Sequence, residues 1–446
     1  GKSVTYALRS VFGRINYGFD DRYLFEANLR YDGSSRFPKH NRFGLFPSFS
    51  FGWRISEENF FKVDFVDNLK LRASWGQLGN QEIDDYLFYD TYSFGYDYSF
   101  GNTLFSGISI NDVMANSAIT WEKTDQIDVG IDADFWGGKL SFTGDFFLKN
   151  THAILLKLPM PDLIGVDAPM QNAGKVRNTG FELALTHRNQ LNLFKYSASF
   201  NFSYVKNEIT DLNGGDIPGR SVGDPVDNIY GYVCEGIFRT QEEIDNSCSQ
   251  IWGAVPGDLK YADINNDNVV DQSDRISLGS TFPKINFGLR LNCEYRNFDL
   301  TMLMQGAGMV KGVTAGEISQ AFMNGGKVTE EWLDRWTPNN INASYPRLTL
   351  SSSSRNYMTS SFWVQNASYL KMRNLQIGYT IPKHLLTNWG ISNLRLYCSI
   401  DNLFTITNFK GLDPEMVTSS TLYPLTRNYS LSLIHISEPT RQEAIS

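Results

Sequence analysis

Several long segments of this chain alternate strictly between apolar and polar residues. In residues 23–31, Tyr-Leu-Phe-Glu-Ala-Asn-Leu-Arg-Tyr, apolar side chains stand at every odd position, with Glu26, Asn28 and Arg30 between them. Because successive side chains of a strand point to opposite faces of a sheet, this pattern predicts a strand with one apolar and one polar face. The same alternation recurs at 127–135, 140–149, 194–204 and 285–296. The chain is therefore predicted to be all-β.

The length and polarity of these segments indicate a membrane. They run for about ten residues, the length that a tilted strand needs to cross a bilayer, whereas strands of soluble sandwiches usually have about five or six. Charges such as Asp132 and Arg290 stand mid-segment, where a hydrated lumen leaves them their water and a packed core would not. Aromatic residues form 14% of the chain, and many stand at strand ends, as in the girdles of membrane barrels. We predict an antiparallel transmembrane β-barrel with long extracellular loops, of which this chain supplies roughly fourteen strands.

A soluble all-β protein, such as a propeller or a large sandwich, is the main alternative fold. Its strands would also alternate, but they should be shorter and separated by regular glycine-rich turns in a detectable repeat. This sequence has no fixed-period repeat, and its connections range from a few residues to several tens. The barrel is favoured for that reason.

The composition argues against several classes of function. No uninterrupted apolar stretch is long enough for a spanning helix, so a membrane crossing would have to use strands. The net charge of −8, from 40 basic and 48 acidic residues, and the lack of a basic cluster argue against nucleic acid as a partner. The sequence contains no His-Glu-x-x-His, no nucleophile elbow and no phosphate-binding glycine loop. We therefore expect no enzymatic activity.

The four cysteines are too few for a disulfide scaffold. Cys293 and Cys398 fall on the apolar positions of their segments, as small lipid-facing residues would. Cys234 and Cys248 flank a polar connection and would be able to pair in an oxidising compartment. The sequence leaves open whether these two are bridged or free.

The clearest local motif is Asp-Ile-Asn-Asn-Asp-Asn-Val-Val-Asp-Gln-Ser-Asp at residues 263–274. Its residues match the ligand positions 1, 3, 5, 7, 9 and 12 of an EF-hand-type calcium loop, position 7 through its backbone carbonyl. The predicted Ca²⁺ ligands are Asp263, Asn265, Asp267, Val269, Asp271 and Asp274. Val270, at position 8, is expected to pack the loop against the protein. The alternative is an Asx-rich turn without an ion, because Asp and Asn are common in turns.

Two residues depart from the EF-hand pattern. Asn268 replaces glycine at position 6, which is tolerable because Asn adopts left-handed backbone conformations. Asp274 is shorter than the usual bidentate Glu. Flanking helices are not evident, so we expect an isolated calcium-type loop, inserted at 257–280, that stiffens a long extracellular connection.

A second connection, residues 86–100, is rich in tyrosine and phenylalanine. Tyrosines on outer loops stack on sugar rings or pack against a partner with little loss of entropy. They also anchor at the lipid interface or pack against neighbouring loops. The predicted ligand or partner contacts are Tyr89, Tyr92, Tyr96 and Tyr98. A short amphipathic helix is expected near 330–336, in another outer loop.

Two further segments are distinctive: Tyr-Leu-Lys-Met-Arg-Asn-Leu-Gln-Ile-Gly-Tyr-Thr-Ile-Pro at 369–382 and Asp-Asn-Leu-Phe-Thr-Ile-Thr at 401–407. Shorter segments of the same kind are 12–17, 30–36, 178–182, 335–338, 345–347 and 411–415. Together they resemble the SusC/RagA-type TonB-dependent transporters of Bacteroidetes outer membranes. The similarity extends over nearly the whole chain up to Ser430, in the expected order.

The resemblance implies a barrel of about 22 strands, preceded by a plug domain and a TonB-contacting segment. Residues 1–430 would be the C-terminal part of that barrel. It also implies active import of large nutrients, glycan oligosaccharides or peptides, across a Gram-negative outer membrane. The implied partners are a SusD-like surface lipoprotein and the TonB complex, which acts through the plug.

Both ends of the chain look incomplete in the sequence. Gly1 begins the chain without a signal peptide, so an N-terminal part is expected to be missing. At the other end, residues 431–446 resemble the in-frame translation of an adapter used in sequencing libraries, and we expect them not to be native. A disordered polar tail is the alternative for these residues.

Other functions remain as alternatives. A passive porin or structural barrel would lack the plug. An outer-membrane lipase or protease would need a catalytic pair at the lumen rim, which the sequence does not show. A secreted calcium-dependent binding protein would not contact lipid. The transporter is favoured because the resemblance is specific and covers most of the chain.

Overall fold

The computed structural model describes residues 5–437, apart from 111–112, 216, 218, 315, 352–353, 388–390, 419–422 and 424. Within these residues, thirteen strands form one antiparallel sheet, and the only α-helix is the short α1 (Gln241–Asp245). No helix in the described part of the chain is long and apolar enough to span a membrane. The all-β prediction is confirmed, with one strand fewer than the roughly fourteen predicted.

The strands of the large sheet lie side by side in the order in which they occur along the chain, so the sheet is an up-and-down meander. The short strands of the connections are not part of it. Its strands are β1 (Leu8–Phe19), β2 (Tyr23–Ser34), β3 (Phe43–Arg54), β4 (Val66–Asn80), β9 (Glu122–Phe135), β10 (Leu140–Lys157), β11 (Met170–Leu191), β12 (Phe194–Asp211), β17 (Ile285–Tyr295), β18 (Phe298–Gly308), β21 (Tyr369–Thr380), β22 (Ile391–Thr407) and β23 (Asn428–Ser437). Their lengths run from 10 residues in β23 to 22 in β11. These are membrane-spanning lengths, as the sequence predicts.

The connections contain short two-stranded ladders and 3-10 turns. The ladder strands are β5 (Tyr92–Phe94), β6 (Tyr98–Phe100), β7 (Thr103–Phe105), β8 (Ile108–Ile110), β13 (Asn228–Gly231), β14 (Cys234–Ile237), β15 (Leu259–Tyr261), β16 (Ile276–Ser280), β19 (Lys311–Val313) and β20 (Val364–Asn366). The 3-10 turns are η1 (Ile55–Glu57), η2 (Asp162–Ile164), η3 (Gln272–Asp274), η4 (Gly316–Ile318), η5 (Met323–Gly325), η6 (Glu330–Asp334), η7 (Arg355–Tyr357) and η8 (Lys383–Leu385). The helix expected near 330–336 is therefore the 3-10 turn η6, whose Trp332 is buried.

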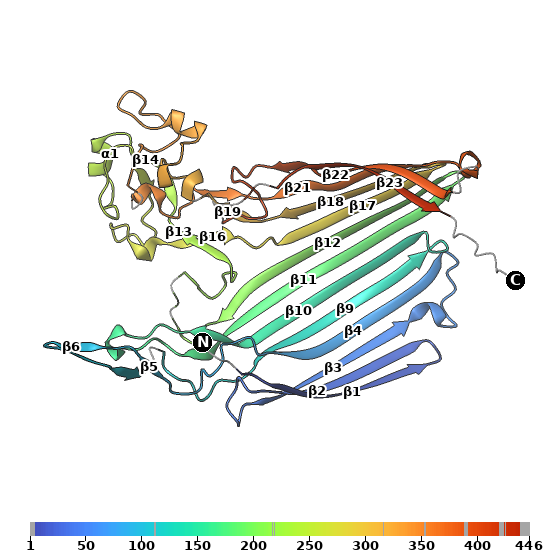
Figure 1. Ribbon diagram of the computed structural model, residues 1–446, viewed down its shortest axis with the longest axis horizontal. Coiled ribbons are helices and arrows are strands. Elements are labelled where there is room, and N and C mark those ends of the chain that lie inside the picture. Colours follow the sequence, from blue (N-terminus) through green and yellow to red (C-terminus); the bar gives the residue numbers. More distant parts are fainter. Residues whose placement is uncertain are drawn as a thin grey trace. The chain divides into compact units, whose positions relative to one another are not determined.

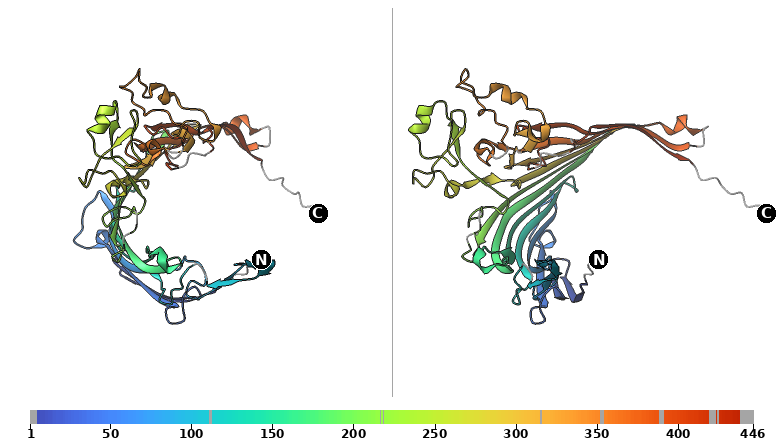
Figure 2. Two further views of the ribbon diagram at one scale, coloured as in Figure 1. Left: turned by 90° about the vertical axis from the view of Figure 1, so that its left-hand side faces the viewer. Right: turned by 60° about the vertical axis from the view of Figure 1, so that its left-hand side comes forward.

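The chain consists of two compact units. Unit 1 comprises Gly1–Gly137, Phe142–Glu182 and Val205–Val226, and unit 2 comprises Gly138–Ser141, Leu183–Tyr204 and Asp227–Ser446. In unit 1, β5 and β6 lie beyond one end of β4 and β9 (Figure 1). In unit 2, α1 and the short strands β13, β14, β16 and β19 gather beyond one end of β17, β18 and β21, as Figure 2 also shows.

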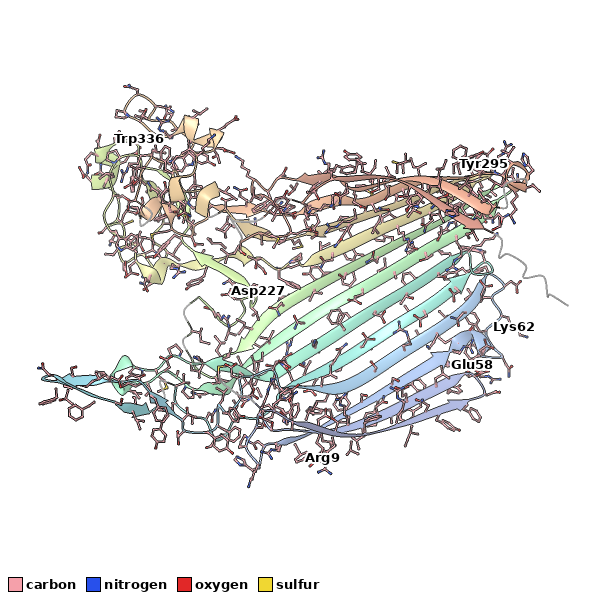
Figure 3. The ribbon with its side chains drawn as sticks, viewed as in Figure 1. Arg9, Glu58, Lys62, Asp227, Tyr295 and Trp336 are labelled. Carbon is pink, nitrogen blue, oxygen red and sulfur yellow. The ribbon has the colours of Figure 1, made fainter. Side chains whose placement is uncertain are left out.

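Successive connections of the antiparallel meander lie at alternate ends of the strands, so the shortest turns share one end and the longest connections share the other. Short turns include 20–22, 192–193 and 296–297. The long connections include 81–121, 212–284, 309–368 and 408–427. In unit 2, Tyr295 precedes a short turn and Trp336 belongs to a long connection, and the two lie at opposite ends (Figure 3).

Cross-strand pairs show that the sheet has one apolar and one polar face. Between β12 and β17, Phe200 is opposite Leu289 and Phe202 is opposite Phe287. On the alternate positions of the same ladder, Ser199 is opposite Arg290. Unit 1 has the same arrangement; its apolar pairs across β2 and β3 are Phe25–Phe51, Ala27–Phe49 and Tyr31–Leu45. The face assignment predicted from the alternation is confirmed.

No second layer covers the apolar face in the described part of the chain. Aromatic side chains on it are exposed, for example 42% for Phe25 and 54% for Phe146, and Leu289 and Phe202 are half-buried. The four buried hydrophobic clusters lie in the connections and at strand ends, rather than across the sheet. An apolar surface this extensive is unstable in water, so lipid is the environment that suits it.

Aromatic rings pair near the ends of the strands. At the short-turn end, the ring centroids of Phe65 and Phe135 are 6.3 Å apart and those of Phe298 and Tyr379 are 4.7 Å apart. At the long-connection end, Tyr31 stacks on Phe43 at 5.0 Å. Aromatic residues at both levels match the girdles that mark the two interfaces of a membrane barrel.

Two of the four cysteines lie on the apolar face, as the alternation predicts. Cys293 is opposite Tyr196 and Leu300, and Cys398 is opposite Ile377 and Leu431, all on the apolar face. Cys234 and Cys248 are free thiols in this structure. Burial raises the pKa of the Cys234 thiol to about 11, so this thiol is unreactive near neutral pH.

Residues 431–437 complete β23, where Leu433 is opposite Leu396 of β22. That residues 431–446 are not native stays a prediction. Residues 438–446 lie outside the described residues.

The two-faced sheet predicts different tolerance to a cation on adjacent residues of β12. Phe200→Arg in the full-length protein should reduce membrane assembly strongly, because a mid-bilayer cation on the lipid face costs roughly 2–4 kcal/mol. Asn201→Arg, one position along the same strand but on the polar face, should assemble almost normally. The measurement is the fraction of heat-modifiable, folded protein in isolated membranes. Similar losses in both variants would contradict the face assignment.

Candidate functional site

The polar face of unit 1 carries a partly hydrated network of charges. Arg72 of β4 lies 2.8 Å from Asp132 (Nε to Oδ2), 2.7 Å from Asp145 (Nη2 to Oδ1) and 4.0 Å from Asp128 (Nη1 to Oδ1). Lys70 adds a contact of 4.0 Å to Asp132. These side chains keep 18–29% of their surface exposed. Such ion pairs suit a water-filled lumen, where burial does not penalise them heavily.

A groove of about 520 Å³ runs along this polar face. Gly18 and Gly52 form part of its floor, and Glu26, Lys70 and Asp128 are among the charged residues that line it. The groove combines opposite charges with hydroxyl groups and contains no nucleophile paired with a base. Such a lining offers charged groups and hydroxyls that can hydrogen-bond polar molecules.

The aromatic connection forms a projecting arm. We call residues 89–110 the aromatic arm; in it β5 pairs with β8 and β6 pairs with β7. The turn between β6 and β7 contains Gly101 with a φ of 61°, a conformation that favours glycine. The predicted contact residues are all on this arm, with exposed fractions of 56% for Tyr89, 67% for Tyr92, 48% for Tyr96 and 66% for Tyr98.

The base of the aromatic arm is fixed to the strands. Phe37, Phe46, Ile119 and Trp121 form a buried cluster against which Phe88 packs. Next to the cluster, Arg36 donates to Asp85 and to the carbonyl of Gln81 at 3.2 Å each. The exposed rings therefore stand on a firm support, which reduces the entropy lost when they contact another molecule.

The calcium-type motif forms a tight loop of Asx turns, which we call the Asx loop (residues 263–274). The Asp263 carboxylate accepts hydrogen bonds from the backbone N–H groups of Asp267 (3.3 Å) and Asn268 (2.7 Å). Asn265 accepts from Asp267 at 3.0 Å, and Asp267 accepts from Val269 at 2.8 Å. These contacts orient the oxygen-bearing side chains around one short stretch of backbone.

Two details of the Asx loop confirm the sequence predictions. Asn268 has a φ of 66°, the left-handed conformation expected at the glycine position. Val270 is 1% exposed and packs with Tyr232, Leu259 and Tyr261 in a buried cluster. The loop is therefore anchored to the protein at the predicted position.

Asp274 is held differently from its neighbours. It is fully buried, and its Oδ1 accepts from Ile264 at 2.7 Å while its Oδ2 accepts from Asp271 at 2.8 Å. Asp271 in turn accepts from Ser273 at 2.7 Å and caps η3. No group of three His, Cys, Asp or Glu side chains within the described residues is placed to hold a metal ion. Calcium binding here stays a prediction.

Residues 227–284, the larger part of the connection between β12 and β17, pack against the connection 309–368, and we call these two segments the loop module. Asp258 is 3% exposed and accepts hydrogen bonds from Arg347 (2.6 Å) and Asn356 (2.9 Å). Arg355, also buried, donates to Gln250 at 2.6 Å and lies over the ring of Tyr261, 5.2 Å from its centroid. These long-range contacts hold together two segments that are distant in sequence.

Burial changes the acidity of groups inside the loop module. Burial lowers the pKa of the Arg355 guanidinium and raises the pKa of the Tyr261 hydroxyl above its ordinary value. Tyr261 donates this hydroxyl hydrogen to the Arg355 carbonyl at 2.6 Å. The hydrogen-bonded group around Asp258 and Arg355 is a hub that the amino-acid sequence does not reveal. Only the short family match at 345–347 points to this region, and a residue's place in the sequence does not show which distant residue it contacts.

The loop module also borders an open pocket of about 880 Å³. Glu235, Arg239, Glu243 and Lys260 line it together with the ring of Phe362. Lys260 Nζ lies 2.8 Å from Glu235 Oε2. The mixed charges give this pocket no clear preference for a cationic or an anionic molecule.

Comparison with known proteins places this chain in a family. The family model for the TonB dependent receptor-like β-barrel matches residues 1–403. TonB-dependent receptor P3 of Formosa agariphila is 31% identical over an alignment of 427 residues that covers 92% of this chain and 42% of that protein. TonB-dependent receptor SusC of Bacteroides thetaiotaomicron is 30% identical over a gapped alignment of 460 positions that covers 97% of this chain and 44% of that protein.

Solved structures agree with the sequence relatives. The structure of the RagAB peptide transporter matches with a TM-score of 0.81 at 26% identity, over 97% of this chain and 48% of that chain. The siderophore receptor PirA of Acinetobacter baumannii matches at 12% identity and a TM-score of 0.50, which concerns the fold alone. This chain spans less than half the length of each of these relatives.

Proposed function

Because this chain belongs to the TonB-dependent receptor β-barrel family of the outer membrane, and is of the SusC/RagA type, we propose that it is the C-terminal part of the barrel of an active nutrient importer. The observation that carries this proposal is the uncovered apolar face backed by a charged polar face. Such a sheet separates lipid from a hydrated passage. The cargo would cross without a chemical change, so the function is transport rather than catalysis.

The proposed cargo is a large nutrient, either a glycan oligosaccharide or a peptide. The family resemblance supports this size class, and the similar RagAB is a peptide transporter. The proposed route follows the polar face, where groups such as Arg72, Asp132 and Arg290 would stay hydrated beside the cargo. Hydrogen-bonding groups along such a wall can exchange water for cargo hydroxyl or amide groups at little net cost.

The proposed partners follow from the same resemblance. A SusD-like surface lipoprotein would cover the outer opening and help capture cargo. The TonB complex would supply energy through a plug and an N-terminal segment of the whole protein, because the outer membrane has no ATP supply. The exposed rings of Tyr89, Tyr92, Tyr96 and Tyr98 are proposed to contact the lipoprotein or the cargo.

We also propose that the Asx loop binds Ca²⁺ through Asp263, Asn265, Asp267 and Asp271, with the carbonyl of Val269. The hard oxygen donors and the EF-hand-type spacing support this proposal. Asp274, the sixth predicted ligand, would act by orienting backbone N–H groups, since it is fully buried, whereas Asp263 is half-buried and Asp267 and Asp271 are exposed. The bound ion would stiffen the loop module and would have no catalytic role.

A passive porin or structural barrel without a plug is the alternative function, and TonB dependence separates it from the importer. Cells that express the full-length protein should lose uptake of its cargo when the TonB protein is deleted or the proton gradient is collapsed. Uptake should fall about tenfold or more, because conduction through a plugged barrel requires energy. Uptake that persists without TonB would instead favour the porin.

The aromatic arm should matter for contact rather than for folding. Replacing Tyr92 and Tyr98 together by Ala should weaken lipoprotein association or cargo uptake by about thirtyfold, since each exposed ring supplies roughly 1 kcal/mol of contact and about 1.4 kcal/mol is a factor of ten. The matched control is Leu163→Ala, which alters a 99% exposed residue of a different long connection. Both variants should reach the membrane in normal amounts. If the tyrosine variant retains full binding and uptake, the arm has no contact role.

Calcium should protect the segment 257–280 from proteolysis. With Ca²⁺ the native loop should be cleaved slowly, and with a chelator quickly; Asp263→Ala combined with Asp267→Ala should abolish the difference. The control is Glu242→Ala combined with Asp245→Ala, which removes two exposed carboxylates from α1 outside the Asx loop. Cleavage of the native loop at the same rate with calcium and with chelator would remove the metal proposal.

A further inference from the structure

Strand β21 contains a bulge that adds one basic residue to its polar face. The pairing of β21 shifts register between Met372 and Asn374 on the β22 side and between Leu303 and Met304 on the β18 side. Arg373 is the extra residue, and its Nε donates to Gln305 Oε1 at 3.1 Å. Bulges of this kind re-aim a side chain, here so that Arg373 lies beside Lys371.

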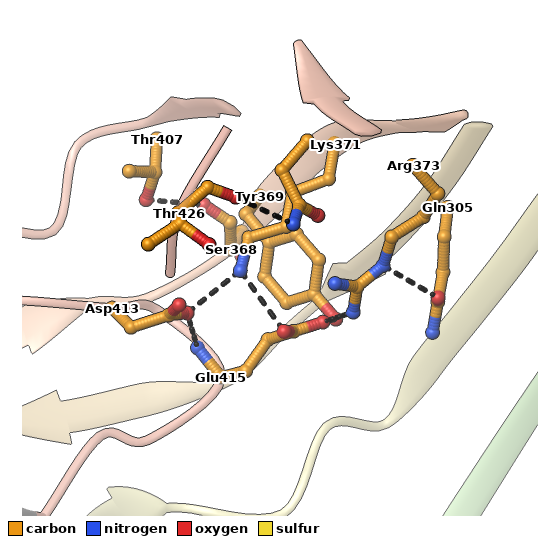
Figure 4. A network of polar contacts seen from close by, with 10 residues as sticks. Gln305, Ser368, Tyr369, Lys371, Arg373, Thr407, Asp413, Glu415 and Thr426 are labelled. Atoms are coloured by element: carbon orange, nitrogen blue, oxygen red, sulfur yellow. Dashed lines mark hydrogen bonds and ion pairs between the residues drawn. The ribbon is translucent and has the colours of Figure 1, made fainter. Parts of the chain in front are cut away.

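Two acidic residues from a distant segment meet these two cations (Figure 4). Lys371 Nζ lies 2.7 Å from Asp413 Oδ1 and 2.9 Å from Glu415 Oε2. Arg373 forms a second ion pair with Glu415, and Tyr369 donates its hydroxyl to the same carboxylate at 2.8 Å. The two positive and two negative charges balance, and we call this group the clasp.

The clasp is shielded from water. The Lys371 side chain is 3% exposed, those of Asp413 and Glu415 are 10% and 22% exposed, and that of Arg373 is 25% exposed. Burial opposes ionisation of Glu415, but hydrogen bonds from Lys371, Tyr369 and Arg373 outweigh it and lower the pKa of this carboxyl. A buried lysine without its counter-charges is strongly unfavourable. The clasp is therefore stable when complete, or when every charge is released to water, and unstable in between.

The segment that carries the acidic residues also contacts the loop module. Phe409 and Val417 pack with Val310 and Ala367 in a buried cluster. The Val417 carbonyl accepts from the Val313 N–H at 3.0 Å, so the segment is hydrogen-bonded to β19. Near the start of the segment, the backbone N–H of Lys410 donates to Gln365 of β20 at 2.9 Å. The Lys410 ammonium lies 3.5 Å from the Glu331 carboxylate.

We propose that Phe409–Val417 is a strap that the clasp fastens to the polar face of β21, and that the strap couples the loop module to this strand. Asp413 and Glu415 bind the strap to β21, and Phe409 and Val417 bind it to the loop module. Opening the clasp would free both sides together, because the hydrophobic cluster is small and depends on the position of the strap. This inference does not depend on what is transported.

The strap is tested in detergent with variants of the full-length protein that each remove one charge from the clasp. Lys371→Met and Glu415→Gln should each speed trypsin cleavage after Lys410 by about tenfold or more, because either change leaves a buried charge without its partner. Hydrogen exchange at the Val313 amide should accelerate in the same variants. Glu415→Gln preserves the size of the side chain, and heat-modifiable gel mobility reports that the barrel is still folded.

Lys260→Met is the matched control, since it breaks an exposed ion pair with Glu235 within the loop module. Cleavage after Lys410 should be unchanged in it. In the native protein, about 1 M salt should also leave cleavage unchanged, since buried pairs are screened much less than exposed ones.

Unchanged cleavage in both clasp variants would overturn the strap. Faster cleavage without faster exchange at Val313 would overturn the coupling, and an equal effect of Lys260→Met would show general loosening instead.

Discussion

Hydrogen bonding between neighbouring strands is the constraint on which the rest of this structure depends. The apolar face is uncovered, so its environment is lipid, which offers the backbone no hydrogen-bond partner. Each long strand therefore has to satisfy its N–H and C=O groups on the adjacent strands, and the strands pair in simple chain order. The short turns and the alternation of polarity fix the register. This register places apolar pairs such as Phe200–Leu289 on one side and polar pairs such as Ser199–Arg290 on the other.

Stability in water is built separately, in the long connections. The buried clusters around Phe37 and Trp121, and around Tyr232 and Tyr261, are small cores that belong to these connections. They give the aromatic arm a firm base and make the loop module rigid. The strap joins this second kind of structure to the first, because Lys371 and Arg373 belong to a membrane strand and Asp413 and Glu415 do not. The clasp thus links a strand that contacts lipid to connections that are packed in water.

The sequence predicted the sheet well and the sites in part. Alternation was sufficient to assign Cys293 and Cys398 to the apolar face and Val270 to a buried position, since each depends on a local pattern. It did not identify Asp258 or Arg355 as a hub, because their partners lie about 90 to 105 residues away. Two adjacent polar residues, Arg373 and Asn374, interrupt the alternation, and this was the available signal for the bulge.

By itself, the sequence determined the fold class, the direction in which each strand residue faces, and the long connections between strands. These follow from a period of two along the chain, which needs no knowledge of distant residues. Only the tertiary structure decided which connections pack together and that Glu415 meets Arg373. Those contacts join segments far apart in the chain, and a local pattern of polarity contains no information about which of many possible partners will be near.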